Sequence, residues 1–286
     1  MKLDGRRTSD NVDDRRGSGK TTAGLGIGGL IIVGIITWLS GGNLGDILNV
    51  FTGQLTNVAQ NGQEYVPSAH EDSMATFASQ ILAGTEDVWT KEFEKMGRKY
   101  VPPKMVLFTQ ATNSGCGSAS AQTGPFYCYV DQTVYLDLSF YDQMKNQLGA
   151  GGDFAYAYVV AHEVGHHVQY LLGTLEKVQQ MQNRASKKES NQLSVRLELQ
   201  ADFYAGIWAY HDNKLFNSLE AGDIEKGLNA ASAIGDDRLQ MQSQGYTVPD
   251  AFNHGTSAQR VRWLKKGATT GRVADGDTFS PDYTSL

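Results

Sequence analysis

Residues 160–170, VAHEVGHHVQY, place three histidines and one glutamate within six positions. Side chains four positions apart on an α-helix differ by only about 40° in direction, so His162 and His166 project side by side. His167 lies about 140° from His162 and cannot share a metal ion with it on a regular helix. In the pattern H-E-x-x-H, two imidazoles bind zinc and the glutamate acts on water. The stretch predicts two metal ligands and one catalytic carboxylate, Glu163, with His167 left to packing or hydrogen bonding.

The motif is expected on a buried helix. Residues 154–172 are predicted to be helical, with Asp153 as the N-cap and Gly173 as the stop. The apolar run YAYVVA precedes the motif and argues against a surface helix with incidental histidines. Because unpaired polar groups are costly to bury, the motif requires polar partners elsewhere in the chain. Gly165 is unfavourable within a helix and favours close packing at that point.

The third ligand is expected from a later helix. Glu198 and Asp202 lie four positions apart in residues 193–210, an amphipathic segment with one apolar face (Leu193, Leu197, Ala201, Tyr204 and Trp208). Two like charges at this spacing on a largely apolar helix are destabilising without a cation. We therefore expect Glu198 to bind the metal and Asp202 to accept a hydrogen bond from a ligand imidazole. The alternative is a solvated acidic pair. Two histidines and a glutamate predict Zn²⁺ as the cofactor.

Charge is distributed unevenly along the chain. The 286 residues carry a net charge of -6, which argues against nucleic acid as the main partner. Six basic and four acidic residues fall within the first twenty positions, so that tail carries +2 and the remainder -8. The N-terminal tail is therefore basic overall, and the rest of the protein is acidic.

An uncleaved transmembrane anchor is predicted at residues 21–40. Residues 23–39, AGLGIGGLIIVGIITWL, carry no charge, and their mild flanks extend them to about 20 residues, the length that spans a bilayer. Five glycines make a soluble core helix costly, and no A-x-A-like site follows to indicate a cleaved signal peptide. Basic residues precede the span and none follows before Lys91. The positive-inside rule then places residues 1–20 in the cytoplasm and the remainder outside the inner membrane, in the periplasm or its equivalent.

The part beyond the anchor divides into a stalk and one domain. Residues 41–70 are rich in Gly, Asn and Gln and are expected to form a stalk or linker. Residues 71–286 are expected to form an α+β domain, in which a few strands precede a mainly helical region. Its expected elements are a helix over 73–96, strands within 104–110 and 126–140, a small-residue loop between these strands, and helices from 153 to about 267.

The two cysteines, Cys116 and Cys128, flank the small-residue loop. In a cytosolic protein they would be read as reduced, buried thiols. Outside the membrane, a disulfide that closes the loop is the better prediction. Such a closure would stabilise the fold by roughly 2–3 kcal/mol.

The combined motifs resemble a known family. HEVGHHVQ followed by ELQADFYAG resembles the gluzincin arrangement, and the chain resembles the bacterial "putative neutral zinc metallopeptidase" family, a membrane-anchored group. The likeness extends to GCGSASAQTGPFYC, VYLDLSF and HGTSAQRVRW, so it covers the anchor and most of the outer domain. Tyr129-Val130 departs from the pattern, where a proline-containing turn is expected. The resemblance implies a zincin-like fold and a bound zinc ion.

Zinc-dependent hydrolysis of peptide bonds is the leading functional hypothesis, with Glu163 as the general base and a peptide or protein as the substrate. The rival hypothesis is a membrane-tethered zinc protein that binds partners without turnover. Glu163 favours catalysis, because structural zinc sites need no base and usually have four protein ligands. An extended peptide could pair with the strand VYLDLSF or with the glycine-rich loop before it.

The residue that would stabilise the oxyanion is less clearly indicated. His254 is the first candidate, since it precedes a helix cap at Thr256 and Ser257 in the family-like block HGTSAQR. Tyr204 and Arg260 are weaker candidates, and a structural role is at least as well supported for each of the three. The remaining histidines, His70 and His211, are expected on the surface.

Overall fold

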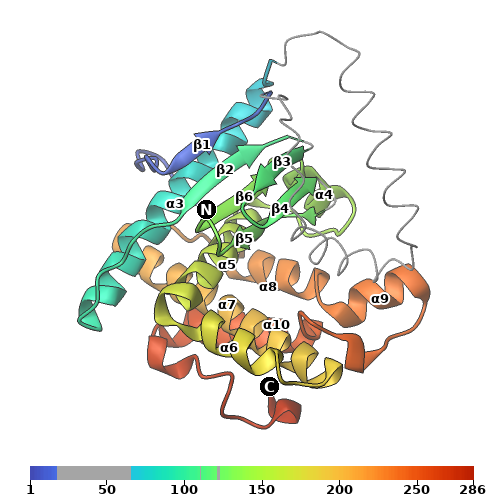
Figure 1. Ribbon diagram of the computed structural model, residues 1–286. Helices are drawn as coiled ribbons and strands as arrows, with labels where there is room; N and C mark the ends of the chain where they lie inside the picture. Colours follow the sequence, from blue (N-terminus) through green and yellow to red (C-terminus); the bar gives the residue numbers. More distant parts are fainter. Residues whose placement is uncertain (18–65, 110, 121–122) are drawn as a thin grey trace.

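The computed structural model describes residues 1–17, 66–109, 111–120 and 123–286 (Figure 1). The predicted anchor at 21–40 and residues 41–65 of the predicted stalk lie outside these ranges. Within the described ranges, no helix has both the length and the apolar character needed to cross a membrane. The first long helix, α3 (Ala69–Lys95), begins at a capping box formed by Ser68 and Glu71, two residues before the predicted start of the domain.

The predicted α+β class is confirmed. A four-stranded sheet has the order β1-β2-β6-β5, in which β1, β2 and β6 are parallel and β5 is antiparallel to β6. Every residue of β6 is buried, as expected for a β-branched and aromatic strand inside a covered sheet. The four strands are β1 (Val12–Asp14), β2 (Lys104–Phe108), β5 (Phe126–Cys128) and β6 (Thr133–Asp137).

Helix α5 (Asp153–Leu172) occupies the centre of the domain. It lies between the sheet and the helices α7 (Lys187–Phe216), α8 (Asp223–Ala233) and α10 (Ser257–Thr270), while α3 runs along the sheet and also contacts α5 (Figure 1). The smaller elements are α4 (Phe140–Asn146), α6 (Thr174–Gln182), α9 (Asp236–Gln244), η3 (Pro249–Ala251), η4 (Val273–Asp275) and η5 (Tyr283–Ser285). The histidine motif therefore lies on a helix that other elements cover on two sides.

The ends of α5 follow the prediction closely, with one correction. Gly173 terminates the helix in the left-handed conformation, at φ 78°. The N-cap is Gly152, at φ 122°, and Asp153 is the first helical residue, where its carboxylate still favours the positive end of the helix dipole. The later helix α7 is longer than predicted, because a capping box at Ser186 and Glu189 starts it before the apolar face begins.

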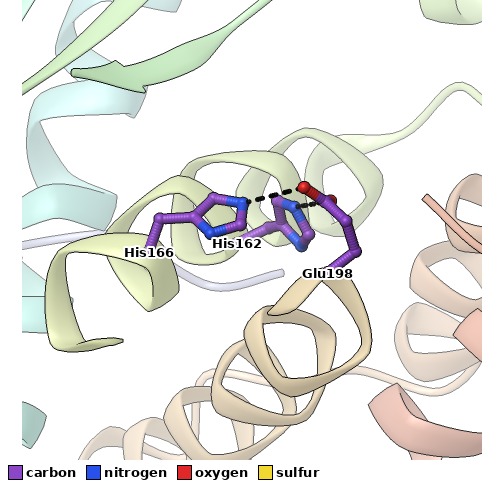
Figure 2. A group of neighbouring side chains, drawn as sticks. All are labelled: His162, His166 and Glu198. Atoms are coloured by element: carbon purple, nitrogen blue, oxygen red, sulfur yellow. Dashed lines mark hydrogen bonds and ion pairs between the residues drawn. The ribbon is translucent and has the colours of Figure 1, made fainter. Parts of the chain in front are cut away.

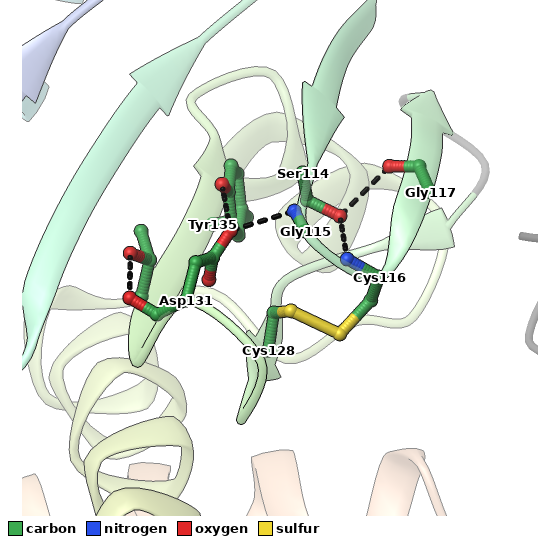
Figure 3. Close-up of a disulfide and its surroundings, with 8 residues drawn as sticks. Ser114, Gly115, Cys116, Gly117, Cys128, Asp131 and Tyr135 are labelled. Carbon is green, nitrogen blue, oxygen red and sulfur yellow. Dashed lines mark hydrogen bonds between the residues drawn. A yellow bond between two sulfur atoms is a disulfide. The ribbon is translucent and has the colours of Figure 1, made fainter. Parts of the chain in front are cut away.

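The predicted disulfide between Cys116 and Cys128 is present (Figure 3). The segment between the first two predicted strands is not a loop but a hairpin, β3 (Ala111–Ser114) and β4 (Gly117–Ser120). Its small residues lack the alternation that signals a strand, so the prediction missed it. The Gly115 amide donates to Asp131 at 2.6 Å, and the disulfide joins the hairpin to β5. These two attachments hold a hairpin that would be marginal alone.

Residues 1–17 are packed against the domain, whereas the sequence suggested a tail apart from it. The Met105 amide donates to the Asn11 carbonyl, and the Arg15 amide donates to the Leu107 carbonyl, both at 2.8 Å. The Arg6 guanidinium lies 2.8 Å from the carboxylate of Asp212, whose side chain is 1% exposed. These partners lie far away in the sequence, so no local pattern in the first residues could reveal the contact.

Hydrogen exchange tests whether this docked arrangement is the state of the full-length protein. The amides of Lys2, Ser9 and Arg15 are expected to exchange slowly, because they donate to the carbonyls of Ser218, Ser79 and Leu107 in the domain. Exchange of residues 11–15 at the rate of an unstructured peptide, measured on the membrane-reconstituted protein, would contradict the docked state. It would be the expected result for a tail on the opposite side of a bilayer.

Candidate metal centre

Two helices bring the three predicted ligands together. His162 and His166 project from α5 toward Glu198 on α7 (Figure 2). The Nε2 atom of His162 lies 3.1 Å from Oε2 of Glu198, and Nε2 of His166 lies 3.5 Å from Oε1. One ligand atom from each residue lies within 4.8 Å of the others. The three side chains form a group that could hold a metal ion.

Close contact between α5 and α7 makes this group possible. A Cβ atom on Gly165 would lie 2.9 Å from the carbonyl oxygen of Ala201 and 3.1 Å from its Cα. Glycine at this position therefore lets the two backbones meet one turn from Glu198, which confirms the packing role expected for Gly165. Gly206 of α7 faces α10, where a Cβ atom would collide with the carbonyl oxygen of Leu264.

Asp202 holds His162 as predicted. Its Oδ1 atom lies 2.8 Å from Nδ1 of His162, which leaves Nε2 directed at Glu198. Two further residues hold Asp202. Tyr158 donates to Oδ1 at 2.6 Å, and the Nε atom of Arg260 donates to Oδ2 at 2.8 Å. Arg260, a weaker candidate for the oxyanion role, is 2% exposed and bound to Asp202, so its role is to orient this carboxylate.

Gln169 orients the imidazole of His166, as Asp202 orients that of His162, and it was not predicted from the sequence. Its Oε1 atom accepts from Nδ1 of His166 at 2.9 Å, and its Nε2 atom donates to the carbonyl of Leu197 at 2.7 Å. The side chain is fully buried. A glutamine three residues after a ligand histidine on an otherwise apolar helix is the signal that could have pointed to it.

The electrostatics of the centre favour a cation. Burial alone would lower the pKa of His162, but the carboxylates of Asp202 and Glu198 outweigh it and raise the pKa to about 10. Burial would raise the pKa of Glu198, whereas His166 and His162 hold it well below its ordinary value. Burial lowers the pKa of His166. The two carboxylates therefore stabilise positive charge at His162, and a metal ion bound by these residues would compete with a proton for that position.

Glu163 lies beside the ligands and is not one of the three. Its side chain is 8% exposed, and burial raises its pKa to about 7, although the charge of His162 opposes this. The backbone amide of Tyr127, on the edge strand β5, interacts with its carboxylate. A carboxyl group with a pKa near neutrality is suited to accept and return a proton.

His254 lies next to the helical turn that carries Glu198. A Cβ atom on its neighbour Gly255 would approach Val195 and Leu199 of α7 at 3.2 and 3.4 Å. The Asp236 carboxylate accepts from the backbone amide of His254 at 2.7 Å and lies 3.2 Å from its Nδ1 atom. Burial would lower the pKa of His254, but Asp236 and Glu198 raise it. Asp236 is a second residue that the sequence analysis missed, because nothing local connects it to His254.

The other candidates lie outside the centre. Tyr204 packs edge-on against Trp89 with 5.4 Å between ring centroids, in the core and away from the oxyanion role. His70 is exposed, as predicted. The surface position predicted for His211 is wrong, because its side chain is largely buried and its Nε2 atom donates to the Gly271 carbonyl at 2.8 Å. His167 faces away from the ligands, as the helical geometry predicted, and is fully buried.

The chain is similar to known proteins along most of its length. The model of the family described as "Putative neutral zinc metallopeptidase" matches residues 1–279. The chain is 52% identical over 287 residues to "Uncharacterized protein YpfJ" of Escherichia coli (strain K12), covering 98% of this chain and 99% of the relative. It is 46% identical over 191 residues to an uncharacterized protein of Mycobacterium tuberculosis (strain H37Rv), covering 63% and 64%. No solved structure matches, so the zincin-like fold stays a prediction.

Proposed function

Because the chain belongs to the family described as "putative neutral zinc metallopeptidase", we propose that His162, His166 and Glu198 hold zinc and that the protein hydrolyses peptide bonds. The observation that carries the proposal is the convergence of the three side chains around one point, with Glu163 beside them. Two imidazoles and one carboxylate form a zinc ligand set that keeps a fourth position for water or substrate. Structural zinc sites usually close the coordination with a fourth protein ligand instead.

The fixed imidazole orientations support the same proposal. Asp202 and Gln169 engage the Nδ1 atoms of His162 and His166, so the Nε2 atoms are directed to the common centre. Such partners orient ligand imidazoles and commonly strengthen metal binding 10- to 100-fold. The residues present therefore suit zinc in chemistry and in arrangement.

Zinc held there would activate a water molecule and polarise the carbonyl of the peptide bond. Glu163 would accept the proton of that water and deliver it to the leaving amine, which its raised pKa favours. His254, backed by Asp236, would donate a hydrogen bond to the negative oxygen that develops during attack. Burial of the centre would limit the competition of bulk water for these hydrogen bonds.

An extended peptide would bind at the edge of β5. The strand predicted for this pairing, VYLDLSF, contributes residues 134–137 to β6, which pairs with β2 on one side and β5 on the other and so has no free edge. Within the described chain, β5 pairs with β6 alone and is adjacent to α5. Strand addition there would place a peptide main chain beside Glu163.

The proposed location is a membrane, with the metal centre outside the cytoplasm. This part rests on the sequence of residues 21–40, on the basic residues before them and on the disulfide, which persists in oxidising compartments. With the tail docked as in this structure, residues 1–17 and the domain lie on the same side. A topology with the tail in the cytoplasm therefore requires it to leave the surface of β2 and Asp212.

The test in cells is a comparison of protein termini between strains that carry the wild type and Glu163→Gln. New termini that occur with the wild type and disappear with the variant are the expected result, and they would also identify substrates. Identical sets of termini, together with an unchanged cellular phenotype and unchanged zinc content, would instead support a non-catalytic zinc scaffold.

A further inference from the structure

Helix α5 presents two functional faces. His162 and His166, four residues apart, face α7 and Glu198 (Figure 2). Glu163 and His167 are also four residues apart, so they share a second face, which meets the edge strand β5. The third histidine of the run is thus aligned with the proposed general base.

His167 makes two hydrogen bonds whose directions can be assigned. Its Nε2 atom lies 2.7 Å from the carbonyl oxygen of Val101, which can only accept, so Nε2 carries the proton. Its Nδ1 atom lies 2.9 Å from the Tyr127 hydroxyl and must accept from it. The imidazole is fully buried, and each of its polar atoms is satisfied by one partner.

Tyr127 is the middle residue of β5 and reaches α5 at two points. Its hydroxyl donates to His167, and its backbone amide interacts with Glu163, one turn earlier on the same helix. The strand contains three residues and pairs with β6 through the register Tyr127–Val134. So short a strand has few main-chain hydrogen bonds, and its separation from the helix therefore depends on side-chain attachments.

We propose that His167 is a positioning residue that anchors β5 through the Tyr127 hydroxyl and thereby fixes the strand edge relative to Glu163. The catalytic part of this proposal rests on the proposed peptidase function. Loss of the anchor would move the edge of β5, where the peptide pairs, relative to the general base on α5. Misplacement of reacting groups by about 1 Å can lower a rate by roughly 100-fold.

Three substitutions test this hydrogen bond. Tyr127→Phe removes the donor and keeps the ring. His167→Leu removes the acceptor for Tyr127 together with the donor to Val101. Tyr100→Phe is the matched control, because the Tyr100 ring packs edge-on against His167 with 5.9 Å between centroids. Its buried hydroxyl makes no hydrogen bond within the described part of the chain.

We expect Tyr127→Phe and His167→Leu each to lower kcat by roughly 10- to 100-fold, with KM and zinc content close to those of wild type. The double variant should be no worse than His167→Leu alone, because His167→Leu already removes the hydrogen bond that Tyr127→Phe removes. Tyr100→Phe should retain the wild-type kcat. Equal kcat in Tyr127→Phe and Tyr100→Phe would overturn the positioning role, as would a loss of activity that only parallels a loss of zinc.

Hydrogen exchange of residues 126–128 in the zinc-loaded full chain provides a readout independent of catalysis. The amides of β5 should exchange faster in Tyr127→Phe and His167→Leu than in wild type and Tyr100→Phe. Exchange unchanged in both test variants would overturn the anchor. If the wild type cleaves no peptide, the proposed function fails by itself, and this exchange experiment still decides whether His167 holds the strand.

Discussion

Replacing Glu163 by glutamine is expected to lower kcat for peptide hydrolysis by roughly 10²- to 10⁴-fold while the zinc content of the protein stays unchanged. Glutamine has nearly the same size as glutamate but cannot accept the proton of the attacking water. The side chain is not one of the three grouped ligands, so its replacement leaves them in place. The measurement is turnover of an unfolded protein substrate by the purified full chain, together with elemental analysis of the same samples.

Glu176→Gln is the matched control for this experiment. Glu176 is an exposed residue of α6, and its replacement changes the net charge by the same amount. It should retain wild-type turnover and zinc. Glu163→Gln with turnover within a few-fold of wild type would exclude Glu163 as the general base. Loss of zinc from this variant would mean that Glu163 contributes to metal binding.

The pH dependence of wild-type turnover has a predictable sign. Burial raises the pKa of Glu163 to about 7, and the nearby charge of a bound dication would lower it. The base works as a carboxylate, so kcat/KM should fall as pH drops through this pKa. The acid limb of the profile is therefore expected below about pH 7, and the residual activity of Glu163→Gln should lack it.

The second large effect is expected from Arg260→Met. This substitution leaves the carboxylate of Asp202 fully buried and without its cation, which costs about 3–5 kcal/mol in the free energy of unfolding. It also loosens the group that orients His162, so zinc affinity should fall by about 10- to 100-fold. Chemical denaturation measures the first effect, and competition with a zinc chelator measures the second.

Arg262→Met is the matched control on the same helix. Arg262 is exposed and donates to the carbonyls of Ser285 and Leu286, away from the metal centre. Its loss should change stability less and leave zinc affinity unaltered. If the zinc affinities of Arg260→Met and wild type agree within two-fold, the chain of contacts from Arg260 through Asp202 to His162 does not support the metal.

The sequence was sufficient to predict the ligand group, and the reason lies in helical geometry. The spacing of His162 and His166 places them on one face, and a buried acidic pair at Glu198 and Asp202 calls for a cation. The structure confirms that these four side chains meet. The first inference needs only the number of residues per helical turn, and the second needs only the free-energy cost of burying two like charges without a cation.

Contacts between segments far apart in the sequence could not be predicted from helical geometry and charge burial. Arg260 was weighed as an oxyanion stabiliser because sequence spacing does not show that α10 brings it to Asp202. Asp236 reaches His254 through a turn whose shape no local pattern indicates. The β3–β4 hairpin and strand β1 contain too few apolar residues to be predicted from the sequence. Strand β1 is held by its pairing with β2 and by the ion pair of Arg6 with Asp212, and the hairpin is held by the disulfide.

Zinc content in wild type and Glu198→Ala, after both have been dialysed against the same chelator, tests the metal centre most directly. The group formed by His162, His166 and Glu198 predicts about one zinc ion per wild-type chain and a large loss in the variant, because two imidazoles alone hold zinc weakly. Glu176→Ala should retain the wild-type content. Equal zinc in wild type and Glu198→Ala would remove Glu198 from the ligand set and contradict the proposed centre.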